Sequence, residues 1–230
     1  MPIDQILNQI FWIFLLGLYT ISVFFLTKKF YDYMIKKHIK KSVAVYYNRK
    51  LIHILAGGVI CLIVPFVFDS PWFPLLAGVF LAFITFLAHR IGNAFYWFQT
   101  ESNINDVSFC LMWGVAIFVL WEIFNNPYIA IIPAAFIAFG DGITGIVRNI
   151  AFQERKKHPI GNVYMMGVCI PIGYFFANMG HPSIPIWGII AAVFASLFER
   201  YEFGIIDDNI LVAGSAIIIL YIGGILGPIG

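Results

Sequence analysis

The sequence predicts an all-α fold, a polytopic membrane helical bundle with about eight transmembrane helices. Hydrophobic residues make up 61% of the 230 residues and charged residues only 11%, which is far from the usage of a water-soluble domain. A membrane span needs about 20 mainly apolar residues, and the apolar runs of this chain have about that length. The eight predicted spans are 6–26, 51–68, 72–89, 107–124, 128–147, 163–179, 184–198 and 210–226.

The positions of the basic residues predict the orientation of the bundle. All 14 Lys and Arg residues fall in four segments between spans, namely 27–50, 90–106, 148–162 and 199–209. Basic connections stay on the cytosolic side of a membrane. We therefore expect the N- and C-termini outside, in a multi-pass integral membrane protein of the cell (plasma) membrane of a prokaryote.

Two parts are expected along the chain. Residues 1–50 are predicted to form the first transmembrane helix plus a basic cytosolic segment. Within them, residues 27–50 mix basic with aromatic and aliphatic side chains, which is typical of a helix lying in the membrane interface. Residues 51–230 are predicted to form a seven-helix membrane domain that carries the chemistry.

The first candidate site residues stand at the start of the second span. Arg49 and Lys50 lie four and three positions before His53, so all three share one face of a helix, and Gly57 leaves a gap one turn further on. Three potential cations on one face suit the phosphate groups of a nucleotide. The alternative is a pair of cations that mark the membrane boundary, beside an incidental histidine.

A second group lies at the end of the fifth span, where Asp141, Thr144, Gly145 and Arg148 fall on one helical stripe. Glycines such as Gly142 and Gly145 let a ligand or another backbone approach closely, and a neighbouring carboxylate can hold Mg²⁺ against phosphate oxygens. Close helix packing is the alternative explanation of the glycines. The GxGxxG spelling here is not a dinucleotide fingerprint, because it follows a membrane span instead of a strand.

A third group gathers acids before the last span: Glu199, then Asp207, Asp208 and Asn209. Helix capping accounts for one oxygen-bearing side chain but not for three. Adjacent carboxylates repel unless a cation or proton lies between them, which favours a Mg²⁺ site. The loop before the sixth span adds Lys157, either as a topological signal or as a phosphate contact.

With these residues assembled, the chain resembles the dolichol kinase, phytol kinase and CTP-dependent diacylglycerol kinase family of membrane lipid kinases, and most closely its archaeal branch. The resemblance covers about residues 49–212, and its motifs differ from many relatives at Ile160-Gly161-Asn162, where those have Glu-Gly-Ser. The four motifs are Arg49-Lys50-x-x-His53-x-x-x-Gly57, Gly140-Asp141-Gly142-x-x-Gly145, Lys156-Lys157-x-x-x-Gly161, and Glu199 followed by Asp207-Asp208-Asn209.

The resemblance implies a kinase that transfers the γ-phosphoryl group of CTP to a polyprenol- or dolichol-type lipid alcohol at the cytosolic membrane face. It implies Mg²⁺ or another divalent metal, and as partners a nucleoside triphosphate, the lipid alcohol and the bilayer, with no nucleic acid. The expected catalytic residues are Asp141, as the base, Lys50 and His53. The expected phosphate-binding residues are Arg49, Lys50, His53, Gly142, Gly145, Arg148 and Lys157. The expected metal ligands are Asp141, Asp207, Asp208, Asn209 and Glu199.

Two other functions compete with this interpretation. A CTP-dependent cytidylyltransferase acting on a lipid phosphate would use similar residues, although the longer acidic and glycine-rich C-terminal signature of those enzymes is absent here. An ion-coupled transporter is the alternative from another class, since intramembrane acids often mark transporters. The polar residues of this chain gather on one predicted side, which disfavours a transport pathway.

Overall fold

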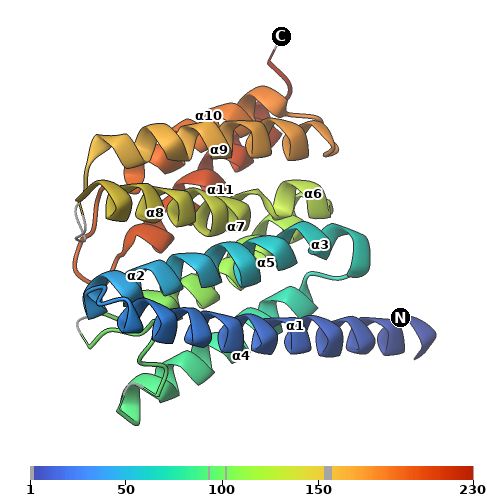
Figure 1. Ribbon diagram of the computed structural model, residues 1–230. Coiled ribbons are helices and arrows are strands. Elements are labelled where there is room, and N and C mark those ends of the chain that lie inside the picture. Colours follow the sequence, from blue (N-terminus) through green and yellow to red (C-terminus); the bar gives the residue numbers. More distant parts are fainter. Residues whose placement is uncertain (1–2, 93, 102, 153–156, 230) are drawn as a thin grey trace.

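The computed structural model describes residues 3–92, 94–101, 103–152 and 157–229, which form a bundle of helices (Figure 1). Within these residues, seven helical stretches are long and apolar enough to cross a membrane, and one shorter apolar helix packs beside them. The predicted all-α polytopic bundle is confirmed. In chain order the elements are α1 (Ile3–Lys36), α2 (Lys41–Ile52), η1 (His53–Gly58), α3 (Val59–Val67), α4 (Trp72–Arg90), α5 (Asn105–Phe124), α6 (Pro127–Ala130), α7 (Ile132–Ala135), η2 (Phe136–Gly140), α8 (Asp141–Phe152), α9 (Pro159–Asn178), α10 (Pro185–Phe198) and α11 (Asp208–Leu226).

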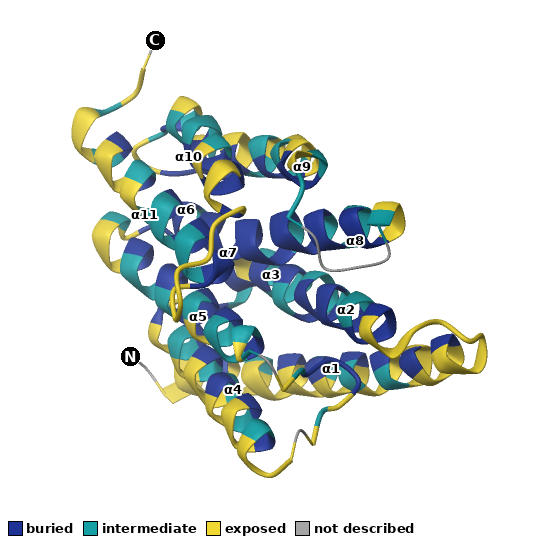
Figure 2. Cartoon of the chain, turned by 90° about the vertical axis from the view of Figure 1, so that its left-hand side faces the viewer, coloured by how far each residue is buried: buried dark blue, intermediate teal, exposed yellow. Residues whose placement is uncertain are grey.

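The centre of the bundle is the span built from α6, α7, η2 and α8. The most apolar 18-residue stretch of this span is 83% buried. The corresponding stretch of α1 is only 22% buried and faces outward (Figure 2). A helix that is apolar on all sides is covered either by lipid, as α1 is on most of its surface, or by neighbouring helices, as this span is. Asn126 starts this span by accepting hydrogen bonds from the backbone N–H groups of Tyr128 and Ile129. The span that carries Asp141 is therefore enclosed by protein.

The basic segment 27–50 differs from the prediction. It is not a separate helix along the membrane interface, because α1 continues without a break to Lys36 and α2 starts at Lys41. The reason is a buried stripe at helical spacing, Val23, Thr27 and Tyr31, which runs past the end of the apolar region and packs beside α2. The two helices therefore form a hairpin whose tip carries the lysines.

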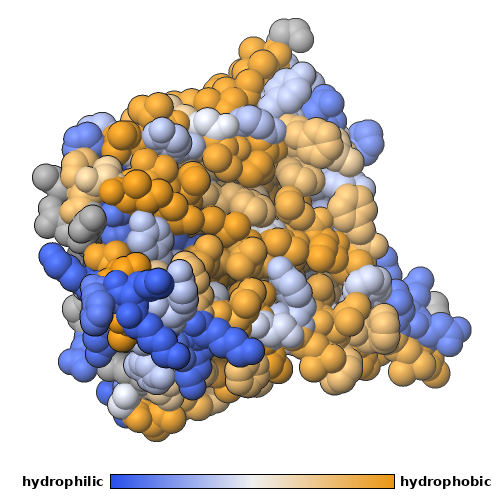
Figure 3. Space-filling view, viewed as in Figure 1, coloured by the Kyte–Doolittle hydropathy of each residue, from blue (hydrophilic) through white to orange (hydrophobic). Residues whose placement is uncertain are grey.

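The two ends of the bundle differ in polarity. The starts of α2, α5, α9 and α11 lie at the left end of Figure 1, and the start of α1 and the end of α11 lie toward the opposite end. The largest group of hydrophilic side chains lies at the left end, a smaller group lies at the lower right, and mainly hydrophobic side chains cover the flank between them (Figure 3). This pattern is that of a multi-pass integral membrane protein, and the segments predicted to share one side of the membrane share one end of the bundle.

Two π-helical stretches, η1 and η2, contact each other next to the buried polar groups. Stretch η1 begins at His53, and η2 ends at Gly140, just before Asp141. An inserted π-turn changes the direction in which later side chains point, and such turns are frequent at functional sites. The aromatic rings of Phe109 and Phe139 cover the glycines of η1, so the contact is tightly filled.

Candidate functional site

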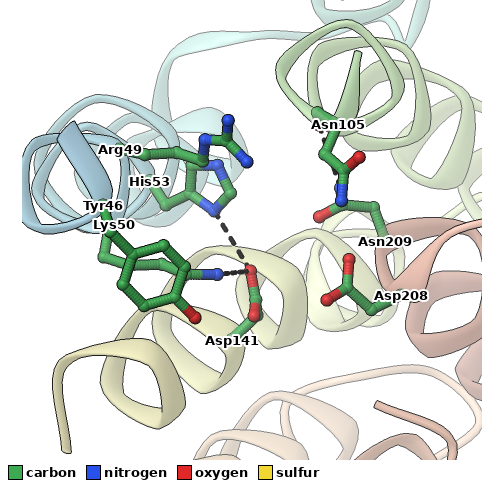
Figure 4. Close-up of a pocket in the computed structure, with 8 residues that line it drawn as sticks. All are labelled: Tyr46, Arg49, Lys50, His53, Asn105, Asp141, Asp208 and Asn209. Carbon is green, nitrogen blue, oxygen red and sulfur yellow. Dashed lines mark hydrogen bonds and ion pairs between the residues drawn. The ribbon is translucent and has the colours of Figure 1, made fainter. Parts of the chain in front are cut away.

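A polar pocket opens at the hydrophilic end, where α2, α5, α8 and α11 converge (Figure 4). Its residues come from segments that are far apart in the sequence, and several of them are charged and buried. Buried charges are rare unless they are paired or bind a ligand, which makes the pocket the candidate site. Its lining residues are Tyr46, Arg49, Lys50, His53, Asn105, Asp141, Asp208 and Asn209.

Asp141 is the meeting point of two of the predicted cations. The Lys50 Nζ atom lies 2.5 Å from Asp141 Oδ2, and His53 Nδ1 lies 3.3 Å from the same oxygen. Because Lys50 and His53 are three positions apart on one helix, both reach the same carboxylate on α8. The His53 ring stacks on Phe109 with its centroid 3.8 Å away. The structure thus brings together the three residues predicted to be catalytic.

The glycines of α8 make this approach possible. The side chain of Lys50 on α2 crosses Gly145, and Ile54 on η1 lies against Gly142, so a methyl group at either position would collide with these side chains. Side chains of a neighbouring helical segment therefore approach Gly142 and Gly145 closely. The sequence predicted that phosphate would contact these glycines. The gap predicted beside Gly57 is likewise filled, by the ring of Phe109.

Three carboxylates from different elements form a buried cluster. One oxygen each of Asp141, Glu199 and Asp208 lies within 4.8 Å of the other two. Such acids repel one another strongly away from water unless cations lie among them. Lys157 supplies one cation, with Nζ 2.6 Å from Asp208 Oδ2 and 3.1 Å from Glu199 Oε1.

Burial and charge act on this cluster in opposite directions. Burial alone would lower the pKa of the Lys157 ammonium, but Asp208 and Glu199 outweigh it and hold that pKa above its usual value. Burial raises the pKa of Glu199, although the neighbouring Lys157 and Arg148 act against it. Lys157 is therefore held as a charged ammonium, and the Glu199 carboxyl is poorly solvated.

Arg148 lies behind Glu199 and is not open to a substrate. Its guanidinium forms two parallel bonds with Glu199, both 2.7 Å long, and donates further bonds to the His158 carbonyl and the Asn162 side chain. The side chain packs on Gly161 and is 1% exposed. In this arrangement Arg148 donates to Glu199, to the His158 carbonyl and to Asn162, and the phosphate contact predicted for it stays a prediction.

The run Asp207-Asp208-Asn209 divides into three roles. Asp207 caps α11 by accepting from the backbone N–H of Ile210 and also accepts from the Ser108 hydroxyl, so it turns away from the carboxylate cluster. Asp208 joins the cluster, and Asn209 faces the pocket. Asp207, which the sequence predicted to be a metal ligand, is thus the one residue of the three whose presence is explained by helix capping.

The amide of Asn209 is fixed by its neighbours. Its Nδ2 group donates to the Asn105 carbonyl at 3.0 Å and to Ser108 Oγ at 3.1 Å, and Asp207 Oδ2 lies 3.3 Å away. All three are acceptors, so the amide cannot turn over without placing oxygen against oxygen. Its Oδ1 atom is buried and has no hydrogen-bond partner among the residues that the structure describes. A free acceptor therefore faces the pocket (Figure 4).

Arg49 lines the pocket but bonds elsewhere. Its guanidinium donates to the Phe98 carbonyl, to Thr100 Oγ1 and to Asn103 Oδ1, all in the connection between α4 and α5. Consecutive residues on a helix point about 100° apart, which is why Lys50 reaches Asp141 and Arg49 does not. The predicted shared phosphate face of Arg49, Lys50 and His53 is therefore split.

Two lining residues were not predicted from the sequence. Tyr46 lies one helical turn before Lys50, and its ring centre is 5.4 Å from the Lys50 ammonium, so the i, i+4 spacing is a signal that could have found it. Asn105 starts α5, and no local pattern marks it. The predicted motif residue Lys156 lies outside the described residues.

The fold and the site define a class, a multi-pass membrane protein with a buried cluster of carboxylates and cations at its hydrophilic end. Comparison of the sequence and the structure with known proteins found no matching family model, no matching curated protein and no matching solved structure. The function is therefore argued from the geometry of the site.

Proposed function

We propose that this chain is a CTP-dependent lipid kinase that phosphorylates a polyprenol- or dolichol-type alcohol at the cytosolic face of the membrane. One observation carries the proposal: the buried acids Asp141, Asp208 and Glu199 converge beside Lys50 and His53 at one end of a membrane bundle. Phosphoryl transfer needs a metal, cations for the phosphates, and a group that orients the attacking hydroxyl. The resemblance of the four sequence motifs supports the same family.

The residues of the cluster suit a divalent metal such as Mg²⁺. Hard cations prefer oxygen ligands, and the carboxylates of Asp141, Asp208 and Glu199 supply them. Asn209 supports this assignment independently, because its Oδ1 atom faces the pocket as a buried acceptor. These four residues would hold the ion, which would neutralise negative charge on the phosphate oxygens. Asp207 is not part of this set.

The remaining pocket residues divide the work of the transfer. Lys50 and His53 line the pocket, and they would bind phosphate oxygens of CTP. Asp141 is the candidate base. It would accept the proton of the lipid hydroxyl while the new oxygen–phosphorus bond forms and the bond between the γ-phosphorus and the bridging oxygen breaks, which releases CDP.

The test of this proposal is a direct transfer assay. Purified protein in mixed micelles is incubated with Mg²⁺, each of several γ-labelled nucleotides, and a panel of polyprenols, dolichols and diacylglycerol. Labelled lipid together with CDP supports the kinase. Pyrophosphate and a CDP-lipid made from a lipid phosphate would support the cytidylyltransferase instead. Absence of transfer from any nucleotide to any alcohol would refute the kinase.

The cytosolic location of the site predicts a pattern of thiol labelling. In a variant without its three native cysteines, Asp69→Cys should react with an impermeant thiol reagent on intact cells, because Asp69 is exposed at the end opposite the pocket. Ser42→Cys, exposed near the tip of the basic hairpin, should react only after the cells are permeabilised. The reverse pattern would place the pocket outside. Gln153 lies outside the described residues.

Removal of the Lys50 ammonium should weaken nucleotide binding selectively. Lys50→Ala is expected to raise the KM for CTP more than the KM for the lipid alcohol, because the ammonium faces the pocket at the hydrophilic end. Steady-state rates with CTP and lipid varied separately measure both constants. If both KM values are the same in the variant and the parent protein, Lys50 does not bind the nucleotide and its role is to neutralise Asp141.

A further inference from the structure

The connection between α4 and α5 leads directly into Asn105, which lines the pocket, and it is held from two sides. On one side, Gln99 donates to Asp106 Oδ2 at 2.7 Å and to the Thr85 carbonyl at 3.0 Å, and His89 lies 2.8 Å from Asp106. These bonds tie the connection to α4 and α5. On the other side, Arg49 reaches it from α2. The connection therefore bridges helices on opposite sides of the pocket.

The contact from α2 is a buried fork of hydrogen bonds. Arg49 Nε lies 3.3 Å from the Phe98 carbonyl, Nη2 lies 3.2 Å from Thr100 Oγ1, and Nη1 lies 3.1 Å from Asn103 Oδ1. The Arg49 residue is 4% exposed. The planar guanidinium presents its donors in a rigid fork that matches these three spread acceptors, whereas a lysine ammonium at the same position is a point charge on a flexible stem.

From Asn103 a chain of hydrogen bonds continues across the pocket. Asn103 Oδ1 also accepts from the backbone N–H of Asn105, at 3.4 Å, where α5 begins. The carbonyl of Asn105 in turn accepts from Asn209 Nδ2 on α11. These bonds connect Arg49 on α2 with the amide whose oxygen faces the pocket (Figure 4).

We propose that Arg49 is a positioning residue that holds the 98–103 connection and, through Asn103 and Asn105, fixes the pocket-facing oxygen of Asn209. Arg49 thus acts on the reaction through its neighbours, and not as a contact to phosphate. The kinetic part of this inference rests on the proposed kinase function. The structural part stands on the hydrogen bonds alone.

The variants Arg49→Lys and Asn103→Ala test the inference. Arg49→Lys keeps the charge and removes the fork, and Asn103→Ala removes the middle of the chain while every cation stays in place. In both, kcat should fall about 10²-fold while the KM for CTP changes less than about threefold, because small displacements of a site group slow turnover without removing a substrate contact.

A second measurement does not depend on activity. Hydrogen–deuterium exchange followed by mass spectrometry should show amides of residues 98–107 exchanging at least about tenfold faster in both variants, since local opening becomes easier. Arg90→Lys is the matched control. Arg90 is an exposed arginine at the end of α4, and its replacement should change neither exchange nor kcat.

The outcomes separate this inference from the proposed function. Unchanged exchange in Arg49→Lys would overturn the positioning role, and so would a raised KM for CTP with unchanged kcat, which is the signature of a phosphate contact. If the parent protein transfers no phosphoryl group, the kinase proposal fails, and the exchange experiment alone decides whether Arg49 holds the connection.

Discussion

Asp141→Asn and Asp208→Asn should each lower the rate of phosphoryl transfer about 10²-fold or more, as is typical when one group that stabilises developing charge is removed. Both carboxylates belong to the buried cluster, where they would share a metal ion with Glu199. An amide keeps the shape of the side chain and removes its charge. The rates are measured at saturating Mg²⁺ and CTP, after size-exclusion chromatography has shown that the variants stay folded.

The neighbouring residue provides the matched control. Asp207→Asn should retain most of the activity, because Asp207 caps α11 and asparagine is an equally good N-cap. Glu122→Gln, at an exposed position on α5 near the end opposite the pocket, should also remain active. An inactive Asp207→Asn beside an active Asp208→Asn would mean that the cluster is assigned to the wrong residues.

The architecture was largely predictable because the bilayer imposes strong patterns on the amino-acid sequence. Apolar runs of about 20 residues are needed to cross hydrocarbon, and the run of basic residues between them marks one side. The segment 27–50 was the exception. Its basic residues indicated an interfacial helix, but the buried spacing of Thr27 and Tyr31 continues α1 beyond the span. The charge of this segment can be read from the sequence, whereas the packing of α2 against the stripe cannot.

The site was predictable to the level of motifs and not of individual contacts. Periodicity indicated that Lys50 and His53 share a face, and both reach Asp141. Periodicity does not say what that face meets, so it grouped Arg49 with them although Arg49 turns to the 98–103 connection. The same holds for the adjacent aspartates Asp207 and Asp208. Asp207 caps α11 and Asp208 is its first residue, so the two side chains take different roles.

Glycine and arginine show why residue type alone misled. Gly145 was expected to admit a ligand, but a missing side chain is equally useful to a packed helix, and here Lys50 occupies the space. Arg148 was expected to bind phosphate because it ends the stripe that begins at Asp141. The sequence does not show that Glu199, 51 positions later, approaches to 2.7 Å and accepts hydrogen bonds from both Nη atoms of Arg148.

Removing either partner of the buried pair Arg148 and Glu199 should destabilise the protein strongly, because the other charge then stays buried alone. Arg148→Met is expected to lower the free energy of unfolding by about 3–5 kcal/mol, because it leaves the Glu199 carboxylate buried without its bidentate partner. Glu199→Gln should be similarly costly, since it leaves the guanidinium uncompensated. Unfolding is measured by denaturant titration in detergent, with a metal chelator present so that ion binding does not contribute.

The double variant Arg148→Met/Glu199→Gln decides whether the effect belongs to the pair. With neither charge left behind, it should cost clearly less than the sum of the two single variants, as interacting neighbours do in a double-mutant cycle. Arg90→Met, at an exposed position, should change stability by less than about 0.5 kcal/mol. Strict additivity of the two single effects would show that Arg148 stabilises the fold through its bonds to the His158 carbonyl and Asn162, and not through Glu199.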